Sequence, residues 1–190
     1  MTARRGIAIA STAVAAAVAV LLAASAWAET TAQSRERPRG AVEDCSTSPG
    51  WGRRDDFTRR DSLVVGPLAI RRANPMLVYA PNVSGNKVIL SVKGGHRVTV
   101  ELSRRTRLNA GLGFGPYPQG EVGFRDTRRI VTFIACRRGE LTGRFDGWPV
   151  TSWVGFLLAR SPMCVPLSVW VDEERSPRRA VIRFGVPDCG

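Results

Sequence analysis

Short apolar runs constrain the fold of this chain more than any other feature of its sequence. From Leu63 onward these runs alternate with Gly, Pro, Asn and Arg, and we find no internal repeat, heptad or convincing amphipathic helix. Regularly spaced short strands separated by turn residues are typical of sandwiches and barrels. We therefore predict an all-β domain, a single antiparallel β-sandwich that is immunoglobulin-like in general architecture. The predicted strands are residues 63–70, 76–79, 87–92, 97–102, 130–136, 152–159, 165–172 and 180–186.

Two of these runs, 130–136 and 152–159, are apolar on both faces, so we place them at sheet centres. The runs 87–92 and 97–102 each carry an apolar residue at every second position. Opposed residues share a face, so a hairpin between these two runs requires Val92 opposite Val98. Residues 94–96 then form its turn, where glycine is available for positive φ.

The last two strands predict how the four cysteines pair. Setting Leu167 opposite Val186 keeps the apolar faces of the two strands together and places Cys164 opposite Cys189. A Cys164–Cys189 disulfide leaves Cys45 to pair with Cys136. Four cysteines allow three connectivities, and the register favours this one. Each bridge is expected to contribute about 2–4 kcal/mol to stability.

The N-terminus has the layout of an export signal. Arg4 and Arg5 precede an uncharged run, 6–28, that ends in Ala-Trp-Ala. We predict a signal peptide over 1–28, a polar disordered tether over 29–43 and the β domain over 44–190. The run is also long enough for an uncleaved membrane anchor, the alternative interpretation. Either way, an even cysteine count behind such a segment indicates a secreted or extracytoplasmic protein.

The chain is basic, with 28 Lys plus Arg against 16 Asp plus Glu and a formal net charge of +12. Positive charge attracts anionic envelope polymers, lipid head groups and acidic proteins. The arginine pairs are spread along the whole chain, whereas a nucleic-acid site more often shows clustered charge, so nucleic acid is not an expected partner. The bias toward Arg over Lys also fits GC-rich codon usage, an interpretation that requires no binding function.

The sequence contains no pattern that specifies catalysis. His96 is the single histidine and falls in a predicted turn with no nucleophile in view. No two cysteines have the Cys-x-x-Cys spacing of zinc or redox sites. Of the two acidic clusters, 55–56 and 172–174, the second lies in a predicted hairpin turn beside arginines, which favours surface ion pairs. We predict a protein that is not an enzyme and has no catalytic residue, metal or cofactor.

A few aromatic and arginine side chains are candidates for partner binding. Indole rings beside a guanidinium on an outer sheet face can bind sugars or proteins, although packing of a covering loop is the commoner cause. The Gly- and Pro-rich stretch 111–120 is either a mobile binding loop or, as we prefer, a structural crossover between sheets. The candidates are Trp148, Trp153, Trp170, Arg183, Phe114, Tyr117 and Arg160.

Several short motifs resemble a group of exported or membrane-anchored, β-rich actinobacterial proteins with paired disulfides. They are Val-Val-Gly-Pro-Leu at 64–68, Thr-Phe-Ile-Ala-Cys at 132–136, Trp-Val-Gly-Phe at 153–156, Cys-Val-Pro-Leu at 164–167 and Phe-Gly-Val-Pro-Asp-Cys at 184–189. The resemblance spans roughly residues 45–189. It implies the compartment, the bacterial setting and the β-rich fold, and it carries over no catalytic residue.

Together these features predict a non-enzymatic binding or structural module of the bacterial cell envelope. Its basic surface would contact an anionic polymer, lipid or acidic protein, and such contacts weaken with salt. The alternative is a secreted hydrolase or protease inhibitor that presents the disulfide-braced loop around Arg160.

Overall fold

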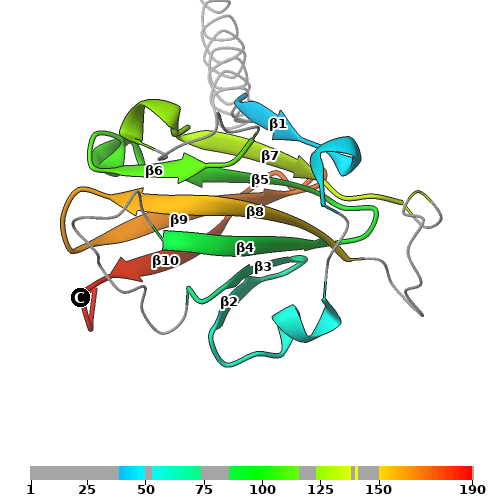
Figure 1. The fold of residues 1–190 in the computed structure, drawn as a ribbon, viewed down its shortest axis with the longest axis horizontal. Helices are drawn as coiled ribbons and strands as arrows, with labels where there is room; N and C mark the ends of the chain where they lie inside the picture. The colour runs from blue at the N-terminus through cyan, green and yellow to red at the C-terminus, as the bar shows by residue number, and fades with distance from the viewer. Residues whose placement is uncertain are drawn as a thin grey trace, which may run out of the picture. The chain divides into compact units, whose positions relative to one another are not determined.

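Among the described residues, ten strands form two five-stranded sheets in the computed structural model (Figure 1). The structure describes residues 39–49, 53–73, 86–115, 123–137, 140 and 150–189. The first sheet has the order β1-β7-β5-β9-β10 and the second β2-β3-β4-β8-β6. The strands of the first sheet are β1 (Ala41–Glu43), β7 (Ile130–Ile134), β5 (Arg97–Leu102), β9 (Met163–Val171) and β10 (Arg178–Phe184). Those of the second are β2 (Ser62–Val65), β3 (Leu68–Arg71), β4 (Asn86–Lys93), β8 (Val150–Ala159) and β6 (Ala110–Gly113).

Four short 3₁₀ turns connect or cover the strands, and the described residues contain no α-helix. They are η1 (Cys45–Thr47), η2 (Arg54–Phe57), η3 (Arg104–Thr106) and η4 (Phe124–Asp126). Within this part of the chain no helix is long and apolar enough to cross a membrane.

One hydrophobic core receives side chains from both sheets. At its centre Phe133 of β7 packs against Phe114 and Trp153, with ring centroids 5.0 and 5.2 Å apart. β7 and β8 lie inside their sheets, each next to an edge strand, whereas β5 and β4 hold the middle positions predicted for residues 130–136 and 152–159. The prediction of an all-β domain is confirmed.

The predicted hairpin between residues 87–92 and 97–102 is wrong. β4 pairs with β3 and β8 in the second sheet, whereas β5 pairs with β7 and β9 in the first. The apolar residues of both strands are nevertheless fully buried in the same core. The alternating pattern requires only that the apolar residues of β4 and β5 face the same core. Here they face it from opposite sheets.

The last two strands do pair, but in a different register. Leu167 lies opposite Ala180, not Val186, which keeps the predicted faces because the shift is an even number of residues. The hairpin closes early because its turn is fixed at Asp172. The Asp172 N–H donates to the carbonyl of Arg97 over 2.8 Å, and Glu174 N–H donates to Val171 over 2.9 Å.

Both predicted disulfides, Cys45–Cys136 and Cys164–Cys189, are present. The second does not arise from direct opposition, since Cys164 lies opposite Arg183. The chain bends after β10 at Gly185, with φ of 59°, and brings Cys189 back to a Cα distance of 5.7 Å from Cys164. Disulfides form and persist in oxidising compartments, so the two bridges indicate an extracytoplasmic environment.

Three predicted boundaries differ from the structure. The predicted strand 63–70 is a hairpin, β2 and β3, that turns at Gly66, whose φ of 60° favours glycine. The tether predicted over 29–43 ends in β1, which pairs in parallel with β7. Stretch 111–120 begins as an edge strand, β6, of the second sheet, and the next strand, β7, belongs to the first sheet; residues 116–120 lie outside the described residues. The predicted signal segment 1–28 and the strand 76–79 lie outside the described residues.

Candidate anion-binding site

Six exposed arginines gather at one end of the two sheets. They come from η3 and the residues after it, from η4 and its neighbours, and from the connection between β8 and β9. Figure 1 shows these three turns together at the left of the view, beside β6. We call this cluster the basic end; its members are Arg104, Arg105, Arg107, Arg125, Arg128 and Arg160.

Strand pairing brings these distant segments together. Ala110 at the start of β6 lies opposite Ala159 at the end of β8, so the residues flanking the two strands are neighbours. The Arg160 N–H donates to the Asn109 carbonyl over 2.9 Å, and Arg160 Nε donates to the Leu108 carbonyl over 3.0 Å. Its guanidinium also stacks on the Phe124 ring, 4.3 Å from the centroid.

Carboxylates offset little of the charge at the basic end. Among the described residues of 103–109, 123–128 and 160–162, Asp126 is the single acidic residue. Its carboxylate is 3.9 Å from Arg125, and it also accepts from the Gly123 N–H over 2.9 Å. Leu108 projects from the same end with 72% of its surface exposed. Within the described residues the basic end therefore combines six exposed arginines with one carboxylate and one exposed apolar side chain.

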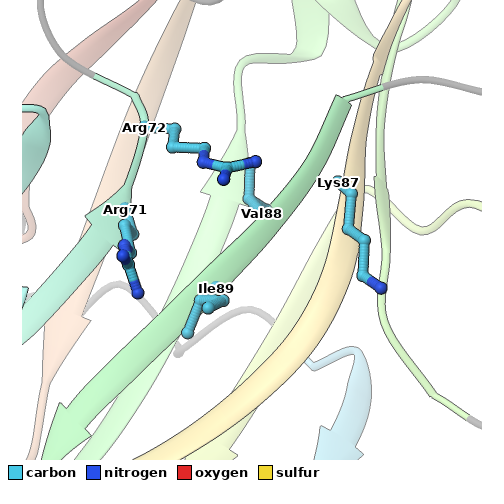
Figure 2. Close-up of a pocket in the computed structure, with 5 residues that line it drawn as sticks. All are labelled: Arg71, Arg72, Lys87, Val88 and Ile89. Atoms are coloured by element: carbon cyan, nitrogen blue, oxygen red, sulfur yellow. The ribbon is translucent and has the colours of Figure 1, made fainter. Parts of the chain in front are cut away.

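A second group of cations surrounds a pocket of about 270 Å³ on the second sheet (Figure 2). Arg71 and Arg72 come from the end of β3, and Lys87 comes from the start of β4. Val88 and Ile89 complete the described lining. Figure 2 shows Ile89 between Arg71 and Lys87, while the Arg72 guanidinium extends toward Val88. The pocket thus combines three cationic groups with an apolar wall.

Behind Arg71 lies a buried polar layer on the outer face of the second sheet. Asp56 of η2 is 1% exposed and accepts a hydrogen bond of 2.7 Å from the Ser91 hydroxyl. The Ser91 and Ser152 hydroxyls are 2.6 Å apart. Arg71 approaches Asp56 only to 3.9 Å, and Arg71 Nε is buried without a hydrogen-bond partner in the described part of the chain. Arg71 is therefore shared between this layer and the pocket.

The pocket and the basic end lie toward the same end of the second sheet. Along β8, Phe156 pairs with Lys87, and Ala159 pairs with Ala110 three residues later. Strands rise about 3.3 Å per residue, so these positions are separated by about 10 Å along the strand. The arginine pairs are scattered along the sequence, so they did not indicate either cluster. The cationic side chains come together only through the strand order, which the sequence did not specify.

The three aromatic candidates that the structure describes, Phe114, Trp153 and Trp170, do not form an exposed surface. Phe114 and Trp153 are buried in the core, and the Trp153 indole N–H donates to the Asp44 carbonyl over 3.1 Å. Trp170 is 5% exposed, and Thr99 is its neighbour on β5. The observed register of β9 and β10 separates Trp170 from Arg183. The Arg183 guanidinium donates to the Pro187 carbonyl over 2.8 Å. Trp148 and Tyr117 lie outside the described residues.

Arg160 does not have the geometry expected of an inhibitory loop. A protease-binding arginine extends away from its own protein into the pocket of the enzyme. Here the Arg160 guanidinium lies over Phe124 and is anchored by the Leu108 carbonyl. Its place in the basic end accounts better for this side chain.

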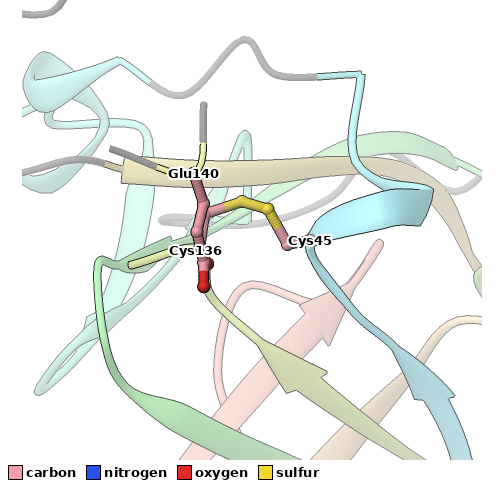
Figure 3. Close-up of side chains that lie close together, drawn as sticks. All are labelled: Cys45, Cys136 and Glu140. Carbon is pink, nitrogen blue, oxygen red and sulfur yellow. A yellow bond between two sulfur atoms is a disulfide. The ribbon is translucent and has the colours of Figure 1, made fainter. Parts of the chain in front are cut away.

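Cys45, Cys136 and Glu140 offer three ligand atoms within 4.8 Å of one another (Figure 3). The two sulfurs are bonded in a disulfide, so neither is a thiolate able to coordinate a metal. Glu140 accepts a hydrogen bond of 2.5 Å from the Arg137 N–H. These three residues form a disulfide beside a hydrogen-bonded turn, and their ligand atoms do not fit a metal ion.

His96 has a partner that the sequence did not reveal. Its Nδ1 lies 2.6 Å from an oxygen of Asp172, whose other oxygen accepts from the Arg97 N–H over 2.8 Å. The pair ties the β4–β5 connection to the β9–β10 turn. No described hydroxyl or thiol bonds to the imidazole, so the pair lacks the nucleophile that a triad requires.

Glu43 is a buried carboxyl group at the end of β1. Burial raises its pKa, the Thr47 hydroxyl opposes this by hydrogen bonding, and the nearby Asp44 charge raises it further. No described arginine or lysine forms an ion pair with Glu43.

No protein-family model and no curated protein sequence matches this chain.

Proposed function

We propose that this protein is a non-enzymatic, extracytoplasmic binding module of the bacterial cell envelope that contacts an anionic polymer through its basic end. The observation that supports the proposal most is the gathering of six exposed arginines around one described carboxylate. Secretion by a cleavable signal peptide, a bacterial and specifically actinobacterial origin, and an immunoglobulin-like arrangement of the two sheets belong to the same proposal.

An anionic polymer fits the basic end better than a single small ligand does. The cations are spread over three segments and all are exposed, so they match repeated charges along a chain. A lipid surface or an acidic protein would use the same charges, and the exposed Leu108 adds a small apolar contact for either. Repeated anionic groups need no such apolar contact, and the arginines greatly outnumber the apolar side chains at this end.

Retention of the oxidised protein on immobilised polyphosphate, eluted with a salt gradient, tests the proposal. The variant R104Q/R105Q/R107Q removes half of the basic end. Each arginine near a polyanionic surface is worth about 1 kcal/mol, so we expect an affinity loss of about 100-fold at low salt. Elution should also shift to lower salt, because fewer counterions are released on binding.

The variant R59Q/R129Q/R178Q is the matched control, because it removes the same net charge from arginines that are paired with carboxylates. It should retain nearly wild-type affinity, provided circular dichroism shows that it folds. An equal loss of polyphosphate affinity in both variants would mean that binding depends on the net charge of the protein alone. Absence of retention for the wild-type protein would refute the proposal.

A further inference from the structure

The pocket between β3 and β4 is a separate site from the basic end. Its lining includes Arg71 and Lys87 on neighbouring antiparallel strands, with Arg71 directly opposite Ile89. We propose that this pocket binds a phosphomonoester group attached to an apolar moiety. The proposal goes beyond polymer binding, because it gives a second surface of the molecule its own ligand.

The size of the pocket favours one compact group over a length of polymer. Sites for drug-sized ligands usually measure about 300–1,000 Å³. At about 270 Å³ this pocket lies just below that range. It can therefore take an end group, whereas the exposed basic end suits a chain of repeated groups.

The charge of the lining favours a phosphomonoester. Neither Arg72 nor Lys87 forms an ion pair with a described carboxylate, and the Asp56–Arg71 approach of 3.9 Å exceeds hydrogen-bond distance. Two cations and part of a third thus remain to be neutralised. A phosphomonoester carries a charge of about −1.5 to −2 at pH 7 and three acceptor oxygens, whereas a carboxylate or phosphodiester carries about −1.

The side-chain chemistry agrees with this charge. Guanidinium groups bind phosphate oxygens through paired N–H donors, and lysine binds phosphate as a point charge. Arg71 lines the pocket, and its Nε is buried with no hydrogen-bond partner in the described chain, so the described residues do not satisfy all the donors of this guanidinium. A guanidinium with unsatisfied donors gains from an anionic acceptor.

The apolar part of the lining determines what carries the phosphate. Ile89 is half-buried and borders the same pocket as the cations, whereas Val88 is already buried in the core. Inorganic phosphate would leave the Ile89 side chain facing a strongly hydrated ion. A ligand with a hydrocarbon portion next to its phosphate would cover Ile89 and gain from its removal from water.

Calorimetric titration of the full oxidised protein with dihexanoyl phosphatidic acid tests the proposal. Dihexanoyl phosphatidylglycerol has the same chains on a phosphodiester, and inorganic phosphate lacks the chains. We expect the phosphatidic acid to bind at least about tenfold more tightly than either, since one charge-assisted contact or the apolar contact is lost in each. Equal binding of the two lipids would overturn the assignment to a phosphomonoester, as would no binding of the phosphatidic acid.

Paired variants separate this site from the basic end. R72Q/K87Q should weaken phosphatidic acid binding by about 100-fold and leave polyphosphate retention nearly unchanged. R105Q/R107Q removes the same charge and should have the opposite pattern. Both variants change exposed residues, so folding should be preserved. If both reduce phosphatidic acid binding equally, the pocket is not the site and the proposal is wrong, whereas polymer binding would stand.

Vesicles identify the source of the ligand. Phosphatidylcholine vesicles containing phosphatidic acid present the phosphomonoester in a membrane, and the short-chain lipid presents it free in solution. Binding to both, lost in R72Q/K87Q, supports a membrane lipid headgroup. Binding to the soluble lipid alone supports a free phosphorylated amphiphile. Vesicle binding that survives in R72Q/K87Q and disappears in R105Q/R107Q would contradict the pocket assignment.

Discussion

The two ends of β9 carry similar residues but differ in how their charges are neutralised. Before its first residue lies Arg160 with the rest of the basic end, where one described carboxylate faces six arginines. Beyond its last residue, Asp172 pairs with His96 and Glu174 pairs with Arg178, both at 2.6 Å. At the second end the acidic side chains of Asp172 and Glu174 are paired within the chain, whereas at the basic end the described arginines outnumber the described carboxylate.

Asp56 is the most deeply buried carboxylate among the described residues, and one of its oxygens accepts a hydrogen bond there. Its removal leaves the buried Ser91 hydroxyl without its acceptor and takes from Arg71 a carboxylate 3.9 Å away. Asp56→Ala should therefore lower the free energy of unfolding by about 3 kcal/mol. The estimate is below the extreme for buried pairs because Arg71 is partly solvated. Urea denaturation followed by fluorescence measures the change.

Asp55→Ala is the matched control one residue away. Asp55 is 44% exposed and pairs with Arg53 and Arg59 at 3.3 and 3.8 Å, so its loss should cost less than about 1 kcal/mol. Equal destabilisation by the two variants would mean that the buried layer is not compensated in the way the distances indicate. Neither variant should lower polyphosphate retention, since neither removes a cation from the basic end.

Residue patterns predicted the parts of the fold that depend on one strand at a time. Alternation located β4, β5 and the last two strands, and the apolar faces of β7 and β8 indicated that each has a neighbour on both sides, whereas β1 and β6 were missed. Which strands become neighbours depends on contacts between distant residues. Val92 and Val98 illustrate the limit, since parity alone could not distinguish a hairpin from two strands facing each other across a core.

The candidate site was harder to predict for the same reason. Arg104 and Arg125 are far apart in sequence, and their segments meet only because Arg128 bridges Leu112 of β6, while the pairing of β6 with β8 adds Arg160. Aromatic residues misled because tryptophan and phenylalanine serve cores as well as interfaces, and Trp153 has its N–H bonded inside the protein. A test for arginines flanking successive predicted strands at the same end would have improved the prediction.

Glu43 is a buried carboxyl group that forms no ion pair with a described arginine or lysine. It therefore differs from the paired carboxylates beyond the last residue of β9. Because burial raises its pKa above the ordinary 4.5, the folded state binds the proton more tightly than the unfolded state does. Its contribution to stability is therefore fully present below the ordinary pKa and is lost as pH rises through the raised pKa.

Glu43→Gln should remove the loss of stability that the wild type suffers as pH rises. We expect the variant to be more stable than the wild type at neutral pH, with the difference shrinking as pH falls through the raised pKa toward 4.5. Thermal unfolding measured from pH 4 to pH 8 tests the expectation. A stability difference that does not change with pH would mean that the substitution acts through packing near Gly115, not through the charge.

The smallest expected effect compares two substitutions that change the net charge equally at opposite ends of β9. Asp126→Asn removes the one described carboxylate of the basic end and keeps an oxygen to accept from Gly123. Glu174→Gln frees Arg178 at the other end. Asp126→Asn should strengthen polyphosphate binding by about fivefold, as expected for one charge near the polymer, and Glu174→Gln should leave it unchanged. Equal gains would show that the polymer responds to the total charge of the protein. Charge pairing would then explain how the two ends differ in structure, but it would not explain where the polymer binds.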